Sequence, residues 1–331
     1  MELNKKFKFV VYGSGNIANT YISAVQNIPN TEVIGVISRS LKSPSKFPEL
    51  KSYKTLSEIT EPFDAVIICT PNYYHHINTI EAAGLGKHVL CEKPIDIKLD
   101  AIDKMIASCK ENNVTLAVSY QRRFSSDNPI VKKLIDENKL GKIFSVDLSV
   151  KNHRDDAYYN SSEYRGTYEI DGGGPFIQQA SHYIDLYYWF FGKPNKIVSK
   201  LGTFVHDLKV EDHGVVICTY EDGMISTITA STATKPGFPA KLEIYTDKGY
   251  LILENDVITH WEIEGIENPT KQENENLHTG SATASVEDTT NHEYVISDFI
   301  TAANENKEPL ISGESARNST EIILDIYNNQ F

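Results

Sequence analysis

Hydrophobic and polar positions in the first third of the chain alternate between short apolar runs and amphipathic stretches. The apolar runs predict strands that are buried on both faces, and they cover residues 7–12, 33–37, 65–69, 88–91 and 114–118. Between the runs, apolar residues recur at helical spacing, as from Ile17 to Ile28 before Pro29 and from Leu99 to Cys109. Strands that alternate with helices predict a doubly wound parallel sheet.

The pattern changes after Gln121. From Phe144 to Val150, apolar residues alternate strictly with Ser and Asp, which predicts a strand with one solvated or partner-covered face. Similar strands are predicted at 215–220, 224–230, 242–246 and 250–253, with turns at 221–223 and 247–249. We therefore predict an α/β protein of two domains. Residues 1–121 form a dinucleotide-binding domain, and residues 122–331 form an α+β domain with a large, mostly antiparallel, open-faced sheet.

Composition narrows the possible partners. The 331 residues carry a formal net charge of −13, which argues against nucleic acid or an anionic membrane surface as the main partner. No apolar run reaches the ~20 residues of a membrane span. The apolar run after Lys6 is too short for a signal peptide, so we expect a cytoplasmic protein.

The cysteines and histidines lack the spacing of metal ligands. The four cysteines show no C-x-x-C motif, and the pair His75-His76 belongs to no H-x-x-x-H motif. We predict buried, reduced thiols and no metal site. The polar segment from Glu264 to Thr290 is predicted to be a long loop of the kind that forms lids or oligomer arms.

A glycine-rich turn follows the first predicted strand, in the sequence Gly13-Ser14-Gly15-Asn16-Ile17-Ala18. Gly13 permits a tight turn, Gly15 removes a side chain that would block a pyrophosphate, and Ala18 lets helix and strand approach closely. The start of the helix offers free N–H groups to phosphates. Alone, this motif is also compatible with a simple tight turn, but its position between a strand and a helix favours a dinucleotide.

The end of the second strand bears on the choice of cofactor. An NAD site usually places an acidic residue about 20 residues after the glycine motif. Here Ser38 and Arg39 occupy that position, and no acid follows until Glu49. A hydroxyl and a guanidinium suit a 2′-phosphate, so the sequence favours NADP. A solvated loop with an incidental arginine would leave NAD open.

Ligands of such sheets bind beyond the carboxyl ends of the strands. The predicted ends carry Thr70-Pro71-Asn72, Glu92-Lys93-Pro94 and Tyr120-Gln121. A lysine there can orient a substrate hydroxyl and share its proton, whereas a lysine before proline elsewhere would be ordinary surface charge.

A second chemical segment runs from Asp171 through three glycines and Pro175 to His182. The glycines permit a ligand or a neighbouring backbone to come close, and the proline can begin a helix. Gln178 and His182 are four residues apart, so they share one helix face. A histidine in that place is a candidate catalyst, against the ordinary alternative of a structural residue.

The segment between these two regions mixes cationic and aromatic residues. It includes Arg154, Tyr159 and Arg165, which could bind a phosphorylated or otherwise anionic substrate. An ordinary solvated loop explains the composition equally well.

Taken together, GSGNIA, CTPN followed by His75, CEKP, YQRRF and GGGPFIQQASHYID resemble the Gfo/Idh/MocA oxidoreductases over essentially the whole chain. The resemblance implies a Rossmann domain followed by an α+β domain whose open sheet commonly forms oligomers, hence a homodimer or homotetramer. It implies reversible oxidation of a hydroxyl on a sugar, inositol or nucleotide sugar with NAD or NADP. Lys93 matches the lysine that contacts nicotinamide and substrate, and His182 matches the catalytic histidine.

The chain departs from many members at Gln178, where they carry Asp, which speaks against simple inositol or glucose dehydrogenase activity. The form G-G-G-x-x-x-[NQ]-Q-x-x-H is similar to a branch that includes UDP-sugar 3-dehydrogenases, so a UDP-N-acetylhexosamine oxidised at C3 is the expected substrate. Three alternatives remain open: a dehydrogenase of free sugars, sugar acids or inositol, a non-catalytic dinucleotide-binding sensor, and redox-assisted glycoside hydrolysis.

The resemblance and the strand ends together give a full set of expected site residues. Lys93 and His182 are the catalytic pair. The expected cofactor-binding residues are Gly13, Ser14, Gly15, Asn16, Ile17, Ser38, Arg39, Thr70, Pro71, Asn72, His75, Glu92, Lys93 and Gln121. The expected substrate-binding residues are Lys93, Tyr120, Arg154, Tyr159, Arg165, Gln178, Gln179 and His182.

Overall fold

The computed structural model describes residues 6–270 and 288–331. They form two compact units. The first contains the chain up to Gln121 and a later segment that ends at Arg317, and the second contains the chain from Arg122 and a final segment from Asn318 to Phe331. The predicted loop between Glu264 and Thr290 lies largely outside the described residues.

The first unit contains a six-stranded sheet in the order β3-β2-β1-β4-β5-β6, and every pair is parallel. This confirms the predicted doubly wound Rossmann sheet. Its strands are β1 (Phe7–Tyr12), β2 (Thr31–Ile37), β3 (Ser52–Tyr53), β4 (Ala65–Ile68), β5 (His88–Cys91) and β6 (Leu116–Val118). Every residue of β4 is buried, as are Phe9, Val10 and Val11 of β1, as expected of central strands in a parallel sheet.

The helices of the first unit include three that connect its strands, α1 (Asn16–Asn27), α2 (His75–Gly84) and α3 (Leu99–Glu111). Short 3₁₀ turns are η1 (Leu56–Glu58), η2 (Asn72–Tyr74) and η3 (Gln121–Phe124), the last of which begins at the boundary of the two units. Helix α8 (Thr290–Glu305) also packs in this unit, against α1.

The position of α8 corrects the predicted domain division, which assigned everything after residue 121 to the second domain. Phe299 on α8 is fully buried, with its ring centroid 6.4 Å from that of Phe7 and 6.3 Å from that of Phe9. The aromatic side chains of the first strand thus depend on a helix almost 300 residues later in the sequence.

The second unit contains a seven-stranded sheet in the order β13-β12-β11-β7-β10-β9-β8. All pairs are antiparallel except β10 with β7, which confirms a mostly antiparallel sheet. Its strands are β7 (Ile143–Lys151), β8 (Lys196–Gly202), β9 (His213–Thr219), β10 (Ile225–Ser231), β11 (Lys241–Thr246), β12 (Gly249–Glu254) and β13 (Val257–Ile263).

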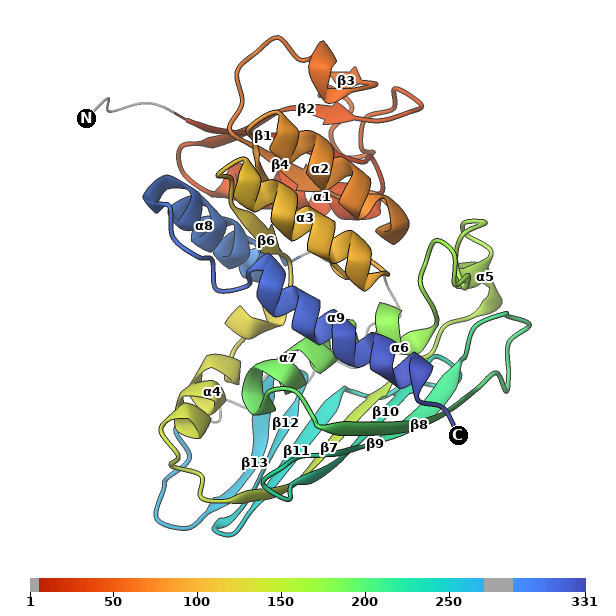
Figure 1. The fold of residues 1–331 in the computed structure, drawn as a ribbon, viewed down its shortest axis with the longest axis vertical. Coiled ribbons are helices and arrows are strands. Elements are labelled where there is room, and N and C mark those ends of the chain that lie inside the picture. The colour runs from red at the N-terminus through yellow and green to blue at the C-terminus, as the bar shows by residue number, and fades with distance from the viewer. Residues whose placement is uncertain (1–5, 271–287) are drawn as a thin grey trace. The chain divides into compact units, whose positions relative to one another are not determined.

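Helices cover one face of this sheet. They are α4 (Asn128–Asp136), α6 (Pro175–Gln178), α7 (Ser181–Phe191) and the end of α9 (Gly313–Asn328), whereas α5 (Asp156–Tyr159) lies in the segment between β7 and α6. Helix α7 packs on β7 and α6 on β10, and Figure 1 shows α4, α6 and α7 on the same side of the sheet. On the opposite face, the exposed side chains of Val215, Ile217 and Ile225 lie on the neighbouring strands β9 and β10.

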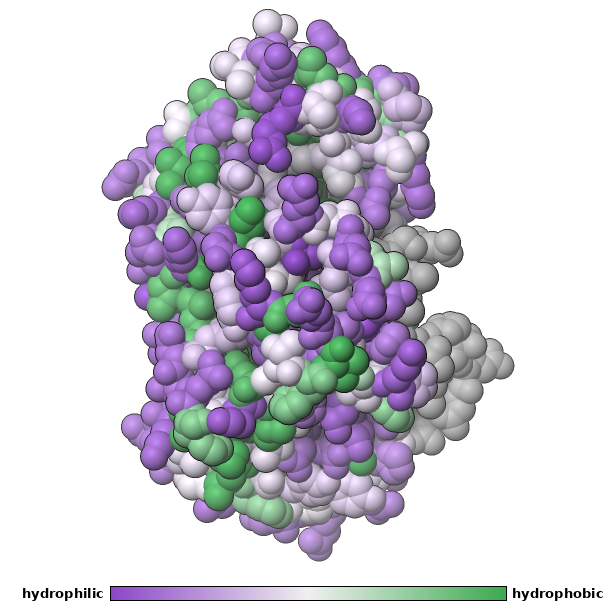
Figure 2. All heavy atoms as spheres, turned by 90° about the vertical axis from the view of Figure 1, so that its right-hand side faces the viewer, coloured by the Kyte–Doolittle hydropathy of each residue, from purple (hydrophilic) through white to green (hydrophobic). Residues whose placement is uncertain are grey.

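The surface is mostly polar, as expected of a chain with a net charge of −13. The face shown in Figure 2 is largely hydrophilic, with hydrophobic residues in small groups. All four cysteines are buried and unpaired with one another, as expected, and burial raises the pKa of Cys69 and Cys91 well above the ordinary value. Within residues 6–270 and 288–331, no helix is long and apolar enough to cross a membrane.

Candidate active site

The turn between β1 and α1 has the geometry that a dinucleotide requires. Gly13 has a φ of +118°, and a Cβ there would lie 2.6 Å from the carbonyl oxygen of Cys69 on the neighbouring strand end. A Cβ on Gly15 would meet no heavy atom within 4 Å, so the space beside the start of α1 is open. Ala18 is fully buried. The structure thus combines a forced turn with an accessible helix N-terminus, the usual place for phosphate groups.

Three hydroxyls meet at the carboxyl end of β2. The Ser38 oxygen lies 3.1 Å from that of Ser14 and 3.2 Å from that of Ser40. The Arg39 guanidinium is exposed, and its carbon lies 5.7 Å from the ring centroid of Tyr74. Hydroxyls and one cation therefore surround the strand end, and no carboxylate follows it directly in the sequence.

His75 holds together two of the predicted cofactor-binding segments. Its ring is fully buried, with Nδ1 2.9 Å from the carbonyl oxygen of Pro94 and Nε2 2.8 Å from that of Thr70. The side chain therefore connects the Thr70-Pro71-Asn72 turn after β4 to the segment after β5. Both ring nitrogens face backbone oxygens of the first unit, and the tautomer decides which nitrogen donates. The Thr70 hydroxyl donates to Asn78 Oδ1 at 2.8 Å.

Lys93 follows β5 and is partly exposed. The carboxylate of Glu92 accepts a hydrogen bond from the Lys93 backbone N–H at 2.9 Å and another from the buried Tyr21 hydroxyl at 2.7 Å. The side chain of Glu92 is thus used to fix the backbone of Lys93. Sequence reasoning gave Glu92 a direct role toward the cofactor and missed Tyr21.

The two residues after β6 differ in their surroundings. Tyr120 is fully buried, whereas Gln121 is partly exposed. The side-chain oxygen Oε1 of Gln121 is buried and has no hydrogen-bond partner within residues 6–270 and 288–331. An acceptor of this kind at a strand end fits a ligand that donates hydrogen bonds.

In the second unit, the three glycines lead into α6 and then α7. Gln178 ends α6, and its amide donates to the Asp171 carbonyl oxygen at 2.5 Å. His182 is the second residue of α7 and is partly exposed. Sequence reasoning allowed a ligand or a neighbouring backbone near the glycines, and the structure places protein atoms there. A Cβ on Gly174 would lie 2.0 Å from the Glu211 carbonyl oxygen.

The basic loop gathers two arginines at one aromatic ring. The guanidinium carbons of Arg154 and Arg165 lie 5.1 and 4.4 Å from the ring centroid of Tyr158. Within the part of the chain that the structure describes, neither arginine forms an ion pair, and the buried Nε of each lacks a hydrogen-bond partner. The Gln179 amide donates to the Tyr158 hydroxyl at 3.2 Å.

Tyr159, also predicted in the site, is turned toward the protein. Its hydroxyl donates to Thr232 Oγ1 at 2.8 Å, and its ring lies beside that of His206, 5.1 Å between centroids. Burial raises the pKa of the Tyr159 hydroxyl to about 12, so it stays protonated at neutral pH. Tyr159 therefore supports the loop, and its neighbour Tyr158, another aromatic residue of the same segment, contacts the arginines.

A buried ion pair anchors the helix of His182. Arg123 donates from Nε to Asp185 Oδ2 at 2.8 Å and from Nη2 to Oδ1 at 2.6 Å, and the Ser319 hydroxyl donates to the same carboxylate at 2.7 Å. Both charged side chains are at most 2% exposed. Asp185 follows His182 by one helical turn, so this pair fixes the start of α7. The sequence offered no signal for it beyond the charged residue in YQRRF.

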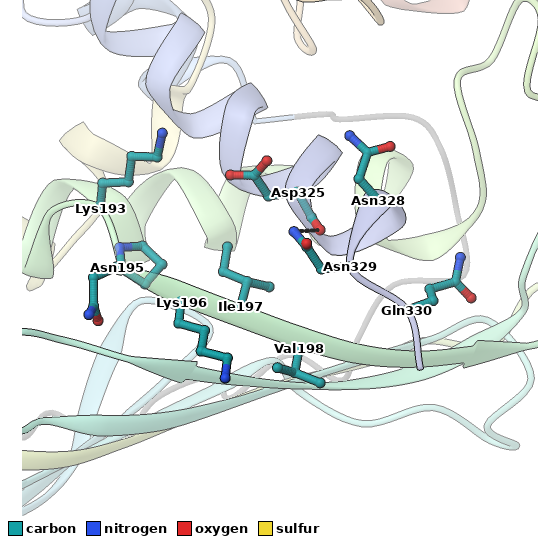
Figure 3. A pocket seen from close by; sticks show the side chains of 10 residues that line it. Lys193, Asn195, Lys196, Ile197, Val198, Asp325, Asn328, Asn329 and Gln330 are labelled. Carbon is teal, nitrogen blue, oxygen red and sulfur yellow. Dashed lines mark hydrogen bonds between the residues drawn. The ribbon is translucent and has the colours of Figure 1, made fainter.

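A polar pocket of about 550 Å³ lies elsewhere in the second unit, between β8 and the end of α9 (Figure 3). Lys193, Lys196, Asp325 and Asn328 are among its lining residues, and no predicted site residue is. Lys193 is paired with Glu321 at 2.7 Å. Among the described residues, the lining is mostly polar and contains no aromatic residue of the kind that usually stacks on a cofactor or sugar ring.

Comparisons with known proteins agree with this division of the chain. Residues 7–120 match the oxidoreductase family with an NAD-binding Rossmann fold, and residues 130–252 match the GFO/IDH/MocA C-terminal domain. The WlbA dehydrogenase from Bordetella pertussis, solved in complex with NADH and UDP-GlcNAcA, is 25% identical with a TM-score of 0.85. That comparison covers 98% of this chain and 96% of that one.

Two further relatives match over shorter spans. Glucose-6-phosphate 3-dehydrogenase from Bacillus subtilis is 31% identical over 147 residues, which are 44% of this chain and 42% of that protein. Myo-inositol 2-dehydrogenase from Thermotoga maritima is 26% identical over 212 residues, which are 62% of this chain and 61% of that protein. Both matches span less than two thirds of the relative's own length.

Proposed function

Because this chain belongs to the Gfo/Idh/MocA family of oxidoreductases, we propose that it oxidises or reduces a ring hydroxyl of a nucleotide sugar, such as a UDP-N-acetylhexosamine at C3, with NAD or NADP. Membership of the family supports the class of reaction, a dehydrogenation at a CH–OH group. The substrate is the finer part of the proposal, and it rests on the second unit.

The observation that carries the substrate class is the pair of arginines at Tyr158. Two guanidinium groups beside one ring, without a carboxylate partner among the described residues, stand out in a protein with a net charge of −13. Phosphates and carboxylates are the groups that arginine binds best, frequently through two parallel hydrogen bonds. The Bordetella relative was solved with an anionic nucleotide sugar, which supports the same interpretation.

The first unit fits a dinucleotide. The open space at Gly15, the start of α1 and the acceptor oxygen of Gln121 suit the phosphates and polar edges of such a group. When bound, the nicotinamide supplies the carbon that exchanges a hydride with the sugar. Ser38 and Arg39 favour NADP over NAD, because a hydroxyl and a cation replace the usual acid.

The proposed roles of the catalytic pair follow from their chemistry. His182 accepts the proton of the sugar hydroxyl, and the Lys93 ammonium donates a hydrogen bond to the same oxygen as negative charge develops there. Gln178 and Gln179 orient the sugar through the loops that their amides hold. Lys93 belongs to the first unit and His182 to the second, and their meeting at one oxygen is part of the proposal.

Substitution of the lysine tests the chemical step. Lys93→Ala should lower kcat by about 100-fold or more, while the dissociation constant of the cofactor changes little. Lys87→Ala is the matched control, since Lys87 directly precedes β5 and donates to the Phe63 carbonyl oxygen. Unchanged turnover in the Lys93 variant would contradict the role of this residue.

The substrate class is tested with a panel of UDP-linked, phosphorylated and free sugars. The proposal expects cofactor reduction with the UDP-linked sugars, and turnover with free sugars or inositol alone would refute it. A phosphorylated free sugar is the second candidate, because the same arginines would bind its phosphate and the Bacillus relative is named for glucose 6-phosphate.

We further propose a homodimer or homotetramer formed through the uncovered face of the second sheet. The exposed apolar residues Val215, Ile217 and Ile225 support this assignment. Native mass spectrometry of the wild-type protein and of Ile217→Lys should show loss of the higher-order species in the variant.

A further inference from the structure

Glu211 is a buried carboxylate that the proposed reaction does not use. It is 3% exposed and directly precedes Asp212 and β9. Its Oε1 accepts hydrogen bonds from the Tyr327 hydroxyl at 2.8 Å and the Phe176 N–H at 3.5 Å, and its Oε2 accepts one from the Gly174 N–H at 3.1 Å. Its charge is therefore met by neutral donors.

The contacts around this carboxylate leave no room for side chains on two of the three glycines. A Cβ on Gly174 would lie 2.0 Å from the Glu211 carbonyl oxygen, and a Cβ on Gly173 would lie 2.4 Å from the Tyr327 hydroxyl. Gly173 also has a φ of +145°, which side chains rarely adopt. The glycines thus allow the backbone to close around Glu211 and Tyr327.

The segment held by Glu211 continues directly to the predicted catalytic histidine. The Gln178 N–H donates to the Gly174 carbonyl oxygen at 3.1 Å, and the Ala180 N–H donates to that of Pro175 at 2.8 Å. The Ala180 carbonyl in turn accepts from the Ile184 N–H in the first turn of α7. A movement of Gly174 is therefore transmitted through α6 to the start of α7, where His182 lies.

We propose that Glu211 is a positioning residue, whose carboxyl group holds residues 174–176 in place and thereby sets the position of Gln178 and His182. The inference rests on the proposed function only in assigning this segment to the substrate side of the reaction. Sequence reasoning missed Glu211, because nothing in its immediate neighbours marks a partner 37 residues earlier.

The raised pKa of Glu211 makes the strength of this hold depend on pH near neutrality. Burial raises its pKa to about 7, and the bonds from Tyr327 and from backbone N–H groups act in the opposite direction. The titratable groups around it are Tyr327 and Tyr168, whose pKa values are also raised, and the neighbouring Asp212, which accepts hydrogen bonds from residues 204–206. Because the pKa is raised in the buried position, ionisation weakens the hold on this segment, which is strongest below about pH 7 and loosens as pH rises through that value.

Hydrogen exchange measured by mass spectrometry on the full chain tests this without a substrate. In Glu211→Gln, peptides that cover residues 172–182 should exchange about 10- to 100-fold faster than in wild type, after correction for intrinsic rates. The control Tyr188→Phe removes another hydroxyl between helices, which accepts from Asn318 at 2.8 Å, and should leave these peptides unchanged. Unchanged exchange in folded Glu211→Gln would overturn the proposal.

A second variant keeps the carboxylate and shifts its titration. In wild type, corrected exchange of residues 172–182 should decrease as pH falls from 8 to 6, with a midpoint near the pKa of about 7, because protonation favours the buried position of Glu211. Tyr327→Phe removes a donor that favours the charged form, so the midpoint should move to higher pH, and an unmoved midpoint would refute the assignment. With an active substrate, Glu211→Gln should lower kcat about tenfold at constant cofactor KM. If the wild-type protein turned over none of the sugars in the panel, the proposed function would be contradicted, but the exchange result would still hold.

Discussion

Replacement of Arg123 by methionine is the most direct test of how the helix of His182 is held. The substitution keeps most of the side-chain volume and removes the guanidinium that binds both oxygens of Asp185. The carboxylate would retain the Ser319 hydroxyl but lose its only ion-pair partner among the described residues. A charge would then remain in a site that is closed to water, since Asp185 is fully buried.

The size of the effect follows from this burial. Removing one partner of a buried ion pair costs about 3–5 kcal/mol, because the remaining charge is left uncompensated. At about 2–4 °C for each kcal/mol in domains of 150–250 residues, the melting temperature of the second unit should fall by about 6–20 °C. Replacing both partners, in Arg123→Met with Asp185→Leu, should recover most of the loss, because no unpaired charge remains.

The assay is thermal and urea unfolding of the full chain, with a surface arginine as the control. Arg317 donates to both oxygens of Asp103, at 2.6 and 3.4 Å, in a pair that is 28% and 54% exposed. Arg317→Met should therefore cost only about 0.2–1 kcal/mol. Equal losses in the two arginine variants, or a double variant as unstable as the sum of its single changes, would refute the reasoning.

Three further predictions concern single sites. Because the folded pKa of Glu211 is raised to about 7, its ionisation opposes folding. The free energy of unfolding should therefore fall by about 3 kcal/mol as pH rises from about 4.5 to 7. Urea titrations at several pH values should show a flatter pH dependence for Glu211→Gln than for wild type. Gly174→Ala should lower the free energy of unfolding by about 3 kcal/mol, because the new Cβ would meet a backbone oxygen. Gly15→Ala should stay within about 1 kcal/mol of wild type in the same titrations, but it should weaken dinucleotide binding. Arg39→Ala should raise the KM for NADP about tenfold relative to that for NAD, and an unchanged ratio would speak against the cofactor preference.

The sequence predicted those parts of the molecule that rest on local patterns. Apolar runs and the glycine turn were sufficient for β1, α1 and β2, and strict alternation was sufficient for β7. The strands β8 and β13 were missed, and both lie at the edges of the second sheet. Edge strands are buried less completely, so they tolerate the charged residues that obscure the pattern.

Long-range partners account for the rest of what was missed. Arg123 gave no indication that it pairs with Asp185, 62 residues later, and Glu211 gave none of its bond to Gly174. His75 was expected to bind the cofactor, and nothing in the sequence indicated that its ring nitrogens lie 2.9 and 2.8 Å from two backbone oxygens. Motifs therefore located the important segments. Which residue in a segment faces a ligand and which one supports the backbone depends on contacts that only the fold creates.

The packing of α8 on the first strand has a consequence for synthesis of the protein. On the ribosome, Phe9 emerges about 290 residues before Phe299, whose ring packs beside it in the folded protein. The nucleotide-binding unit therefore lacks the helix that covers the aromatic side chains of β1 while the seven-stranded sheet of the second unit is being synthesised. A nascent chain of this enzyme thus exposes these aromatic side chains until α8 has been synthesised, and transiently exposed apolar surface of this kind favours aggregation during folding.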